Sequence, residues 1–388
     1  MDKPPQIIPS PPRHKTTAPH LTLDKVPQNR PSEPPPLPKI AVIGGASVDL
    51  YLIGCEEWPK VGERLDLDSV EYHPGGNGLN VAVALAKLEG VDVELYTAVG
   101  SGGHSEFLRR AATQANPTDL VHQRRNLKRP VNLRLATVPE GTTATLSIVK
   151  LSGTDPSFIR APGATEHLHV AHLRDHFGSL SGASFVFLAG LGLTRGLDAV
   201  ELRQLLCDLR IKKPNLKIIA DVALLAQQSL ARQDLVFDIT AILPYIDFFI
   251  PNEHEAIQYS GCANEEAAAR RFLDRGVREA VVVKRANAGV NLYRREGNVT
   301  LPEVTAAYTP DITKGMSVLD TTGAGDTWGA GFVASLARNK DIQYACKIGN
   351  AVAAFCIQKR GATTNIIHNF GFFEGWIAVN PNDRVQLQ

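Results

Sequence analysis

Apolar runs of strand length alternate with helical stretches along most of this chain, and this rhythm limits the folds open to it. The run Lys39–Gly45 is apolar and ends in glycines, as a buried parallel strand does. Helical stretches such as Leu197–Leu209 and Glu265–Arg275 separate the later runs. Strands that alternate with helices of this length predict an α/β fold with a mostly parallel sheet covered on both faces. The further strand candidates are Val93–Val99, Phe185–Leu188, Lys217–Ala220, Phe248–Ile250 and Ala280–Lys284.

Residues 131–151 have a different pattern, because their apolar positions alternate in the manner of half-exposed strands. Pro139-Glu140-Gly141 supplies a turn between two of these strands. We expect a small antiparallel sheet here, outside the main layers, which forms a lid together with the turn-rich residues at about 60–73. The edges of such a sheet can pair with a second copy of the chain. The lid is therefore where a homodimer would form, although the sequence leaves the oligomeric state open.

Residues 1–38 form a separate Pro-rich region before the folded domain. Pro-Ser-Pro-Pro at 9–12 and Pro-Pro-Pro at 34–36 remove backbone donors and fix φ. Too few apolar residues lie between them to form a core, so we expect a disordered tail. It serves either as a linker without a partner or as a docking tail. The folded domain is expected at 39–378, with a C-terminal tail at 379–388.

The composition excludes several classes of function. The chain has 41 basic and 40 acidic residues, without the basic surplus or basic stripe that suits nucleic acid. No stretch approaches the roughly 20 apolar residues that span a bilayer, and the N-terminus has no apolar signal core. The 5 cysteines are scattered without a C-x-x-C pair, which predicts free thiols and a cytoplasmic location.

The strongest chemical signal is the string Asp320-Thr-Thr-Gly-Ala-Gly-Asp326, which runs into an apolar segment rich in Ala and Gly. The small residues leave the backbone bare, so that consecutive N–H groups can point at one spot. The following segment predicts a buried helix, whose dipole adds partial positive charge at residues 323–326. This arrangement predicts a site for a phosphoryl group, with Asp326 beside it as a proton acceptor. The alternative is an ordinary helix cap by Asp326.

This string resembles the C-terminal signature of the PfkB/ribokinase family of carbohydrate kinases. A second string, Pro74–Ala82, is similar to the N-terminal signature of that family, with a Gly-Gly pair and an Asn four residues after its second Gly. The resemblance runs from about Lys39 to Gly371. It implies a ribokinase-like three-layer α/β/α sandwich with a mostly parallel central sheet and a small β-sheet lid.

The resemblance also implies roles for individual residues. Asp326 matches the catalytic base of the family, which accepts the proton of the attacking hydroxyl. Asp49, at the end of the first predicted strand, matches an Asp that holds substrate hydroxyls. The other implied residues are Gly323, Ala324 and Gly325 in an anion hole, and Gly75, Gly76, Asn77 and Asn80 in the sugar site. For the glycines alone, the alternative is a plain turn before a helix.

Asn252 and Glu255 match an Asn-x-x-Glu motif with which family members organise Mg²⁺, its waters and the phosphates of ATP. They follow the strand Phe248–Ile250, at the end where α/β proteins place ligands. Carboxylate and amide oxygens suit a hard cation that keeps several waters. The alternative for a lone motif of this kind is a solvated helix start.

Four further positions follow from the resemblance. Asn350 and Gly361 fall where the family contacts the adenine and its loop. Asp320 and Thr322 fall where many members hold a monovalent cation, often K⁺. These four assignments rest on position along the chain alone.

Two departures from the family pattern concern the substrates. Members usually carry Thr-x-Gly after the strand that meets the nucleotide, whereas this chain has Lys284-Arg285-Ala286 and keeps Gly289. Lys284 would then contact phosphate through its charge. Ribokinases place a Glu after the strand equivalent to Phe185–Leu188, and Ala189–Gly192 follows here. A ribose-type site is therefore not favoured.

Two classes of function remain open. The first is a kinase that phosphorylates a hydroxyl of a small sugar or nucleoside, with ATP and Mg²⁺ and the lid closed against water. The second is a non-catalytic sensor or scaffold that keeps the fold. The histidines between His167 and His176 do not add a metal site, because no carboxylate or cysteine pattern completes one.

Removal of residues 1–36 is expected to leave the melting temperature nearly unchanged, because the tail has no apolar face to pack. Calorimetry of the full chain and of a chain that begins at Leu37 tests this. A melting temperature several degrees lower in the shorter chain would show that the tail docks on the domain.

Overall fold

The computed structural model of the chain describes residues 36–114, 127–139, 141–149, 156–223, 237–296, 299–305, 317–366 and 369–380. The chain divides into two units, Met1–Pro36 and Leu37–Gln388. The expected N-terminal tail lies almost wholly outside the described residues, as do residues 381–388 of the expected C-terminal tail. All described helices and strands belong to the second unit.

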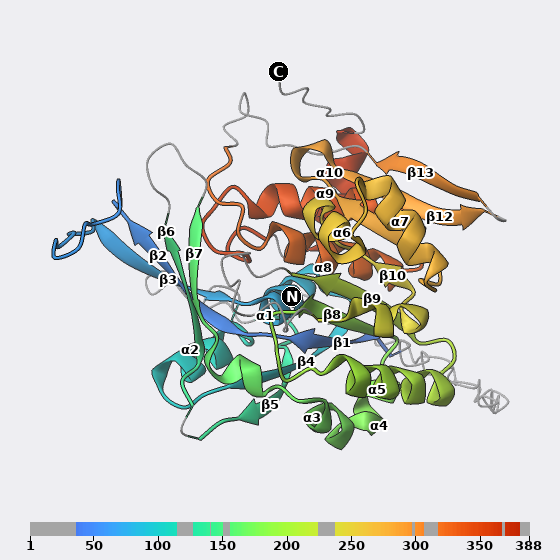
Figure 1. Ribbon diagram of the computed structural model, residues 1–388, viewed down its shortest axis with the longest axis horizontal. Coiled ribbons are helices and arrows are strands. Elements are labelled where there is room, and N and C mark those ends of the chain that lie inside the picture. Colours follow the sequence, from blue (N-terminus) through green and yellow to red (C-terminus); the bar gives the residue numbers. More distant parts are fainter. Residues whose placement is uncertain are drawn as a thin grey trace, which may run out of the picture. The chain divides into compact units, whose positions relative to one another are not determined.

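The main sheet has nine strands in the order β13-β12-β11-β10-β9-β8-β1-β4-β5 (Figure 1). The strands from β11 to β5 run parallel to one another. β12 and β13 extend the sheet as an antiparallel pair at one edge. The bounds are β1 Lys39–Gly44, β4 Asp92–Val99, β5 Asn132–Thr137, β8 Phe185–Leu191, β9 Lys217–Val222, β10 Phe248–Phe249, β11 Ala280–Lys284, β12 Val290–Glu296 and β13 Val299–Thr305.

Helices cover both faces of this sheet, so its strands are buried on two sides. In β1, Ile40 and Val42 belong to one apolar core, while Ala41 and Ile43 belong to the other. The first core is completed by α1 (Asn77–Leu88), α2 (Gly103–Ala111), α8 (Ala324–Leu336), α9 (Ile342–Cys356) and α10 (Phe370–Val379). The second is completed by α3 (Val170–Asp175), α4 (Phe177–Gly182), α5 (Ala199–Lys212), α6 (Glu253–Ser260) and α7 (Glu265–Asp274). The predicted three-layer α/β/α fold is confirmed.

A second sheet, the lid sheet, has four strands in the order β3-β2-β6-β7 and lies beside the main layers (Figure 1). β2 pairs in parallel with β6, and the two outer pairings are antiparallel. Apolar side chains on its outer strands are exposed, among them Tyr72 and Phe158. The bounds are β2 Ser47–Ile53, β3 Ser69–Gly75, β6 Ala144–Val149 and β7 Ser157–Ala161.

The prediction of one antiparallel sheet within residues 131–151 was wrong. β5 joins the main sheet, parallel to β4, and only β6 enters the lid sheet. The reason is that β5 is the edge strand of a sheet covered on both sides. Leu133 and Leu135 pack against one core and Ala136 against the other, and all three stay partly exposed. An edge strand of this kind has the same half-exposed alternation as a lid strand.

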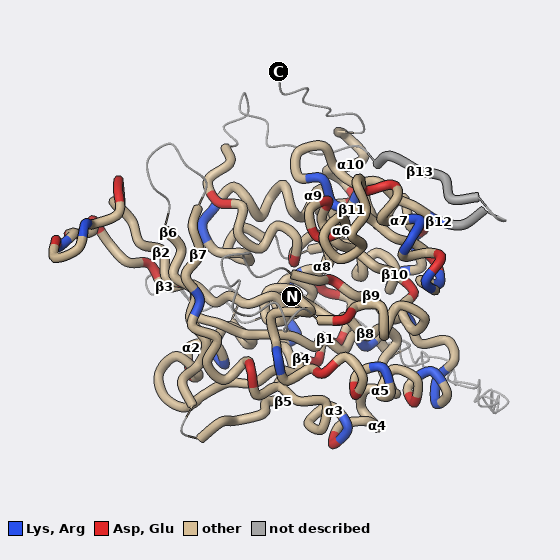
Figure 2. Tube along the Cα trace, in the orientation of Figure 1, with Lys and Arg blue, Asp and Glu red and all other residues tan. Residues whose placement is uncertain are grey.

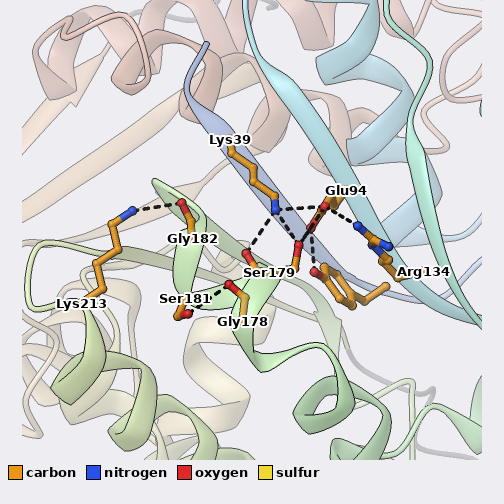
Figure 3. Close-up of polar contacts among 9 residues, drawn as sticks. Lys39, Glu94, Arg134, Gly178, Ser179, Ser181, Gly182 and Lys213 are labelled. Atoms are coloured by element: carbon orange, nitrogen blue, oxygen red, sulfur yellow. Dashed lines mark hydrogen bonds and ion pairs between the residues drawn. The ribbon is translucent and has the colours of Figure 1, made fainter. Parts of the chain in front are cut away.

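A buried carboxylate ties β5 to the rest of the sheet (Figure 3). Glu94 of β4 lies 3.0 Å from Lys39 Nζ of β1 and 3.0 Å from Arg134 Nη2 of β5. It also accepts hydrogen bonds from Tyr96 and from Ser179 of α4. Burial acts to raise the pKa of Glu94, but these partners outweigh it and bring the pKa to about 2. The carboxylate therefore stays charged and holds three strands and a helix at one point.

Acidic and basic residues are interspersed along the described chain, without a stripe of one sign (Figure 2). Among the described helices, none combines the length and the apolar character needed to cross a membrane.

Glu94→Gln is expected to lower the free energy of unfolding at pH 7 by about 1–3 kcal/mol, because hydrogen bonds to a charged group are lost. The folded-state pKa lies below the ordinary value of 4.5, so this stability is present above about pH 4.5 and is lost as the pH falls toward 2. The difference in the free energy of unfolding between the variant and the wild type should therefore become smaller as the pH is lowered. Urea unfolding over a pH series measures it.

The control for this experiment is Glu106→Gln, since Glu106 forms an exposed pair with Arg110 within one helix. A loss below about 0.5 kcal/mol is expected there. Equal effects of the two substitutions would contradict the importance of the Glu94 cluster.

Candidate active site

Asp326 lies in the first turn of α8, as the sequence predicts. Gly323 is the N-cap residue, with φ 76°, a left-handed conformation that glycine adopts without strain. A Cβ at this position would lie 2.1 Å from Cβ of Ala362, so a side chain has no room either. The first turn of a helix leaves backbone N–H groups without helical partners. The backbone N–H groups of Gly323 and Gly325 therefore offer donors next to the carboxylate of Asp326, whereas that of Ala324 donates to the carbonyl of Thr321 at 3.2 Å.

Two amides of α1 hold the carboxylate of Asp326, one on each oxygen. Asn77 Nδ2 donates to Oδ1 and Asn80 Nδ2 donates to Oδ2, each at 2.8 Å. Burial raises the pKa of Asp326 to about 6, although both amide hydrogen bonds act to lower it. The group is therefore ionised at neutral pH yet close enough to titration to accept a proton. The sequence assigned both asparagines to the sugar site and did not predict this contact.

Asp49 lies beside this cluster, but in a different element from the one expected. It belongs to β2 of the lid sheet and does not end the first strand, because the chain leaves the main sheet after Gly44 and enters the lid sheet at Ser47. Its side chain is 1% exposed and accepts a hydrogen bond of 2.9 Å from the Ser47 hydroxyl. Burial raises its pKa to about 7, and the negative charge of Asp326 adds to the rise.

The glycine pair of the N-terminal signature makes room for these groups. A Cβ at Gly75 would lie 2.1 Å from the carboxylate of Asp49. Gly76 has φ 89°, and a Cβ there would lie 2.7 Å from Cα of Ala46. Both glycines are thus required by the close approach of β2 to the start of α1.

Asn252 and Glu255 come together at the start of α6, just beyond β10. Asn252 Oδ1 accepts from the backbone N–H of Glu255, and Glu255 Oε2 accepts from that of Asn252, each at 2.8 Å. The two residues therefore form a capping box, which is the helix-start alternative. Glu255 is nonetheless buried. Its pKa is raised to about 7, by burial first and then by the negative charge of Asp221.

Lys284 is paired with a carboxylate that the sequence did not single out. Its Nζ lies 2.8 Å from both carboxylate oxygens of Asp221, at the end of β9. Burial acts to lower the pKa of Lys284, but the charges of Asp221 and Glu255 leave it above the ordinary value. A Cβ at Gly325 would lie 3.4 Å from the same Nζ. The ammonium group therefore faces the N-terminus of α8. Gly289 follows β11 in a turn, with φ 84°.

Asp320 holds two loops together. Its Oδ1 accepts from the backbone N–H of Thr322 at 3.0 Å. Its Oδ2 accepts from the Tyr51 hydroxyl at 2.5 Å and from the backbone N–H of Gly361 at 3.2 Å. Gly361 therefore lies beside Asp320. Within the described residues, the buried hydroxyl of Thr322 makes no hydrogen bond of ordinary geometry, although it interacts with the Tyr51 hydroxyl. A hydroxyl oxygen of this kind next to a buried carboxylate is compatible with a monovalent cation.

Asn350 is placed under α8, where its Oδ1 accepts a hydrogen bond of 2.8 Å from Trp328 Nε1. It is 6% exposed. This hydrogen bond gives the buried amide of Asn350 a partner inside the core. Its contact with adenine stays a prediction. On the other face of the sheet, His172 Nε2 of α3 and His176 Nδ1 just after it each donate to a backbone carbonyl.

A small hollow that is partly open to solvent adjoins Asn77. Its wall is built from the β1–β2 turn, the start of α1, the end of β8 and the lid sheet. Arg160 of β7 lines it, and sequence reasoning did not find this residue. The lining residues are Gly45, Ala46, Ser47, Gly76, Asn77, Ala144, Arg160, Thr165, Gly190, Leu193 and Thr194.

The residues present fit a nucleotide with a divalent cation. The start of α8 is free of side chains beyond Cβ at Gly323 to Gly325 and faces a lysine, which suits phosphate oxygens. The carboxylate of Glu255 is buried and lies within electrostatic range of Lys284 and Asp326. Hard oxygen donors next to a phosphate cradle suit Mg²⁺.

Comparison with known proteins agrees with the fold described above. A model of the pfkB family carbohydrate kinases matches residues 37–369. Ribokinase of Haemophilus influenzae is 28% identical over 334 residues, which cover 84% of this chain and 94% of that protein. The structure of Arabidopsis thaliana ribokinase complexed with ribose and ATP has a TM-score of 0.65 and 21% identity, covering 88% of this chain and 98% of that one. That of a putative ribokinase II of E. coli with ATP and Mg²⁺ has a TM-score of 0.67 and 19% identity, covering 88% and 100%.

Lys284→Met is expected to lower the free energy of unfolding by about 3–5 kcal/mol, because it leaves the buried Asp221 without its cation. Asp221→Asn should also destabilise the protein, by leaving the ammonium unpaired. The double variant should lose less than the sum of the two single losses, since neither charge remains. Urea unfolding of all four proteins gives the coupling. Strictly additive losses would mean that the pair is not a unit.

Proposed function

The chain belongs to the pfkB family of carbohydrate kinases, and from that premise we propose that it transfers the γ-phosphoryl group of ATP to a hydroxyl of a small sugar or nucleoside. The observation that carries this proposal is the position of Asp326. It is a buried carboxylate at a helix N-terminus, held on both oxygens, with a pKa of about 6. A general base works best when its pKa lies near the working pH.

In the proposed step, Asp326 accepts the proton of the acceptor hydroxyl as the oxygen attacks the γ-phosphorus. The new O–P bond forms while the bond from the γ-phosphorus to the β–γ bridging oxygen breaks, and ADP leaves with that electron pair. The amides of Asn77 and Asn80 fix the carboxylate, so that no reorganisation is needed at the moment of transfer. Their second effect is to keep Asp326 ionised at neutral pH.

The backbone of Gly323, Ala324 and Gly325 forms the proposed anion hole for the moving phosphoryl group. The dipole of α8 adds positive charge at the same place. Lys284 is the proposed phosphate contact, because its Nζ faces Gly325. Asn350, Gly289 and Gly361 stay proposed members of the nucleotide site.

Asn252 and Glu255 are the proposed residues for Mg²⁺, which neutralises charge on the phosphates when bound. Asp320 and Thr322 are proposed for a monovalent cation such as K⁺, supported by the buried Thr322 hydroxyl. Asp49, Gly75, Gly76, Asn77 and Asn80 are proposed for the acceptor site. A carboxylate such as that of Asp49 can accept hydrogen bonds from two neighbouring hydroxyls.

The lid sheet is proposed to close over this site and to exclude water, which would otherwise accept the phosphoryl group. Its exposed apolar strands support pairing with a second copy of the chain. The free cysteines support a reducing compartment such as the cytoplasm. Residues 1–38 are proposed as a separate tail and 39–378 as one kinase domain.

Asp326→Asn is expected to lower kcat by about 10²–10⁴-fold, because the general base is lost. ADP release with a panel of sugars and nucleosides measures it. The matched control is Asp341→Asn, since Asp341 only caps α9. If Asp326 were merely a helix residue, the two variants would lose activity alike, and a non-catalytic protein would show no ADP release at all.

The pH profile of the wild type gives a second readout of the same base. The carboxylate must be ionised to accept a proton, and its pKa is about 6. kcat/KM is therefore expected to fall at least tenfold per pH unit below pH 6, because Asp49 and Glu255, with pKa values of about 7, lose their charge before Asp326 does. A rate that stays constant down to pH 4 would remove Asp326 from the proton transfer.

A further inference from the structure

The hollow beside Asn77 has one charged side chain in its wall, that of Arg160. Its remaining polar lining consists of Asn77 and the hydroxyls of Ser47, Thr165 and Thr194. Gly190, with φ 64°, keeps the hollow open, because a Cβ there would lie 2.5 Å from Oδ1 of Asn77. The wall therefore offers neutral hydrogen-bonding groups and a single positive charge.

Arg160 has neutral partners but no carboxylate. Its Nη2 donates to the carbonyl of Leu193 at 2.9 Å and to the hydroxyl of Thr165 at 3.1 Å. Among the described residues, no carboxylate oxygen lies within 4.0 Å of its guanidinium group, whereas Glu166 nearby is paired with Arg195 at 3.2 Å. A guanidinium group carries five N–H donors and stays charged at any ordinary pH. The partners seen here fix its position. The nearby charge of Glu166 attracts it without forming an ion pair, and Glu166 is itself paired with Arg195.

Such a charge is costly when it is partly removed from water. Burial lowers the pKa of Arg160, which shows that its solvation is reduced. An oxyanion bound in the hollow would supply the missing negative charge and accept the remaining donors. A planar fork of donors matches carboxylate and phosphate in particular.

The same hollow adjoins the reacting groups. Asn77 in its wall donates to Asp326 at 2.8 Å, and Ser47 in its wall donates to Asp49 at 2.9 Å. Neither carboxylate lines the hollow itself, so a molecule there would contact Asn77, Ser47 and Arg160 and lie one side chain away from Asp326 and Asp49. The amide of Asn77 and the hydroxyl of Ser47 suit hydroxyl groups, and the guanidinium group suits an anion.

We propose that the phosphoryl acceptor is a small polyol that carries an anionic group, a carboxylate or a phosphate monoester, which pairs with Arg160 in this hollow. This inference rests on the proposed kinase function and names the class of its acceptor. Arg160 is then a specificity-determining residue on the lid sheet.

The test compares acceptors that share a carbon skeleton and differ in charge: D-glucose, D-gluconate and D-glucose 6-phosphate, and likewise D-ribose, D-ribonate and D-ribose 5-phosphate. ADP release by the full chain gives kcat/KM for each. An anionic member is expected to exceed its neutral parent by about tenfold or more, because charge-assisted hydrogen bonds discriminate at that level. The comparison of the sugar acids with the sugar phosphates decides whether a carboxylate or a phosphate is recognised.

Arg160→Gln should reduce this ratio by about tenfold, mainly through KM, and Arg160→Lys should restore part of it because the charge returns. Arg174→Gln is the matched control, since Arg174 forms a surface pair with Asp208 far from the hollow lining. It should keep the wild-type ratio. Thermal melting of each variant verifies folding, and the wild-type ratio decides the question even if Arg160→Gln does not fold.

Two outcomes separate this inference from the kinase function. Turnover of neutral acceptors with no preference for any anionic member would overturn the inference and leave the kinase function standing. If no acceptor is turned over, isothermal titration measures the binding of the same acceptors instead. If gluconate or a sugar phosphate binds the wild type and binds Arg160→Gln more weakly, the site is supported and the kinase function is not. If the anions bind the wild type no better than their neutral parents do, the site is overturned.

Discussion

The contact between Asp326 and the two asparagines of α1 sets the geometry on which the site depends. It requires α1 and α8 to start next to each other and close to β1. That approach is possible because Gly78 has no side chain, since a Cβ there would lie 2.6 Å from the backbone of Gly44. On the far side, Gly331 of α8 leaves room for the backbone of Gly349 in α9. The carboxylate is thus held by packing of backbones, which is stiffer than packing of side chains.

The features that depend on residues close together in the chain were predicted correctly from the sequence. The start of α8 follows from glycines and an Asp within seven residues, and the sheet follows from the strand and helix rhythm. β5 was assigned to the wrong sheet because half-exposed alternation describes any strand with one open edge. The partners of Lys284 and Arg160 were missed for another reason. Asp221 and Leu193 lie far from them in the chain, and no pattern in a single sequence links such positions.

The buried carboxyl groups of the site repel one another, and one cation offsets part of this repulsion. Asp49, Glu255 and Asp326 are all buried carboxyl groups whose pKa is raised, first by burial, and the charge of Asp326 adds to the rise at the other two. Lys284 is the cation that offsets part of this repulsion, held by Asp221 at the sheet edge. A lysine at this position therefore contributes to the stability of the empty site, and in the proposed function it also attracts phosphate. Family members with Thr-x-Gly have no charge at this position, so the position cannot stabilise the empty site in that way.

The parallel pairing of β2 with β6 constrains how the protein folds. These strands are adjacent in the lid sheet, yet the chain between them contains β3, α1, β4, α2 and β5. The lid sheet cannot close until the intervening chain, which includes β4 and β5 of the main sheet, brings Ala144 back to Ser47. Because non-local parallel pairs form slowly, the lid is a late event in folding. During synthesis, β2 leaves the ribosome long before its central partner, so its edge stays open in the meantime.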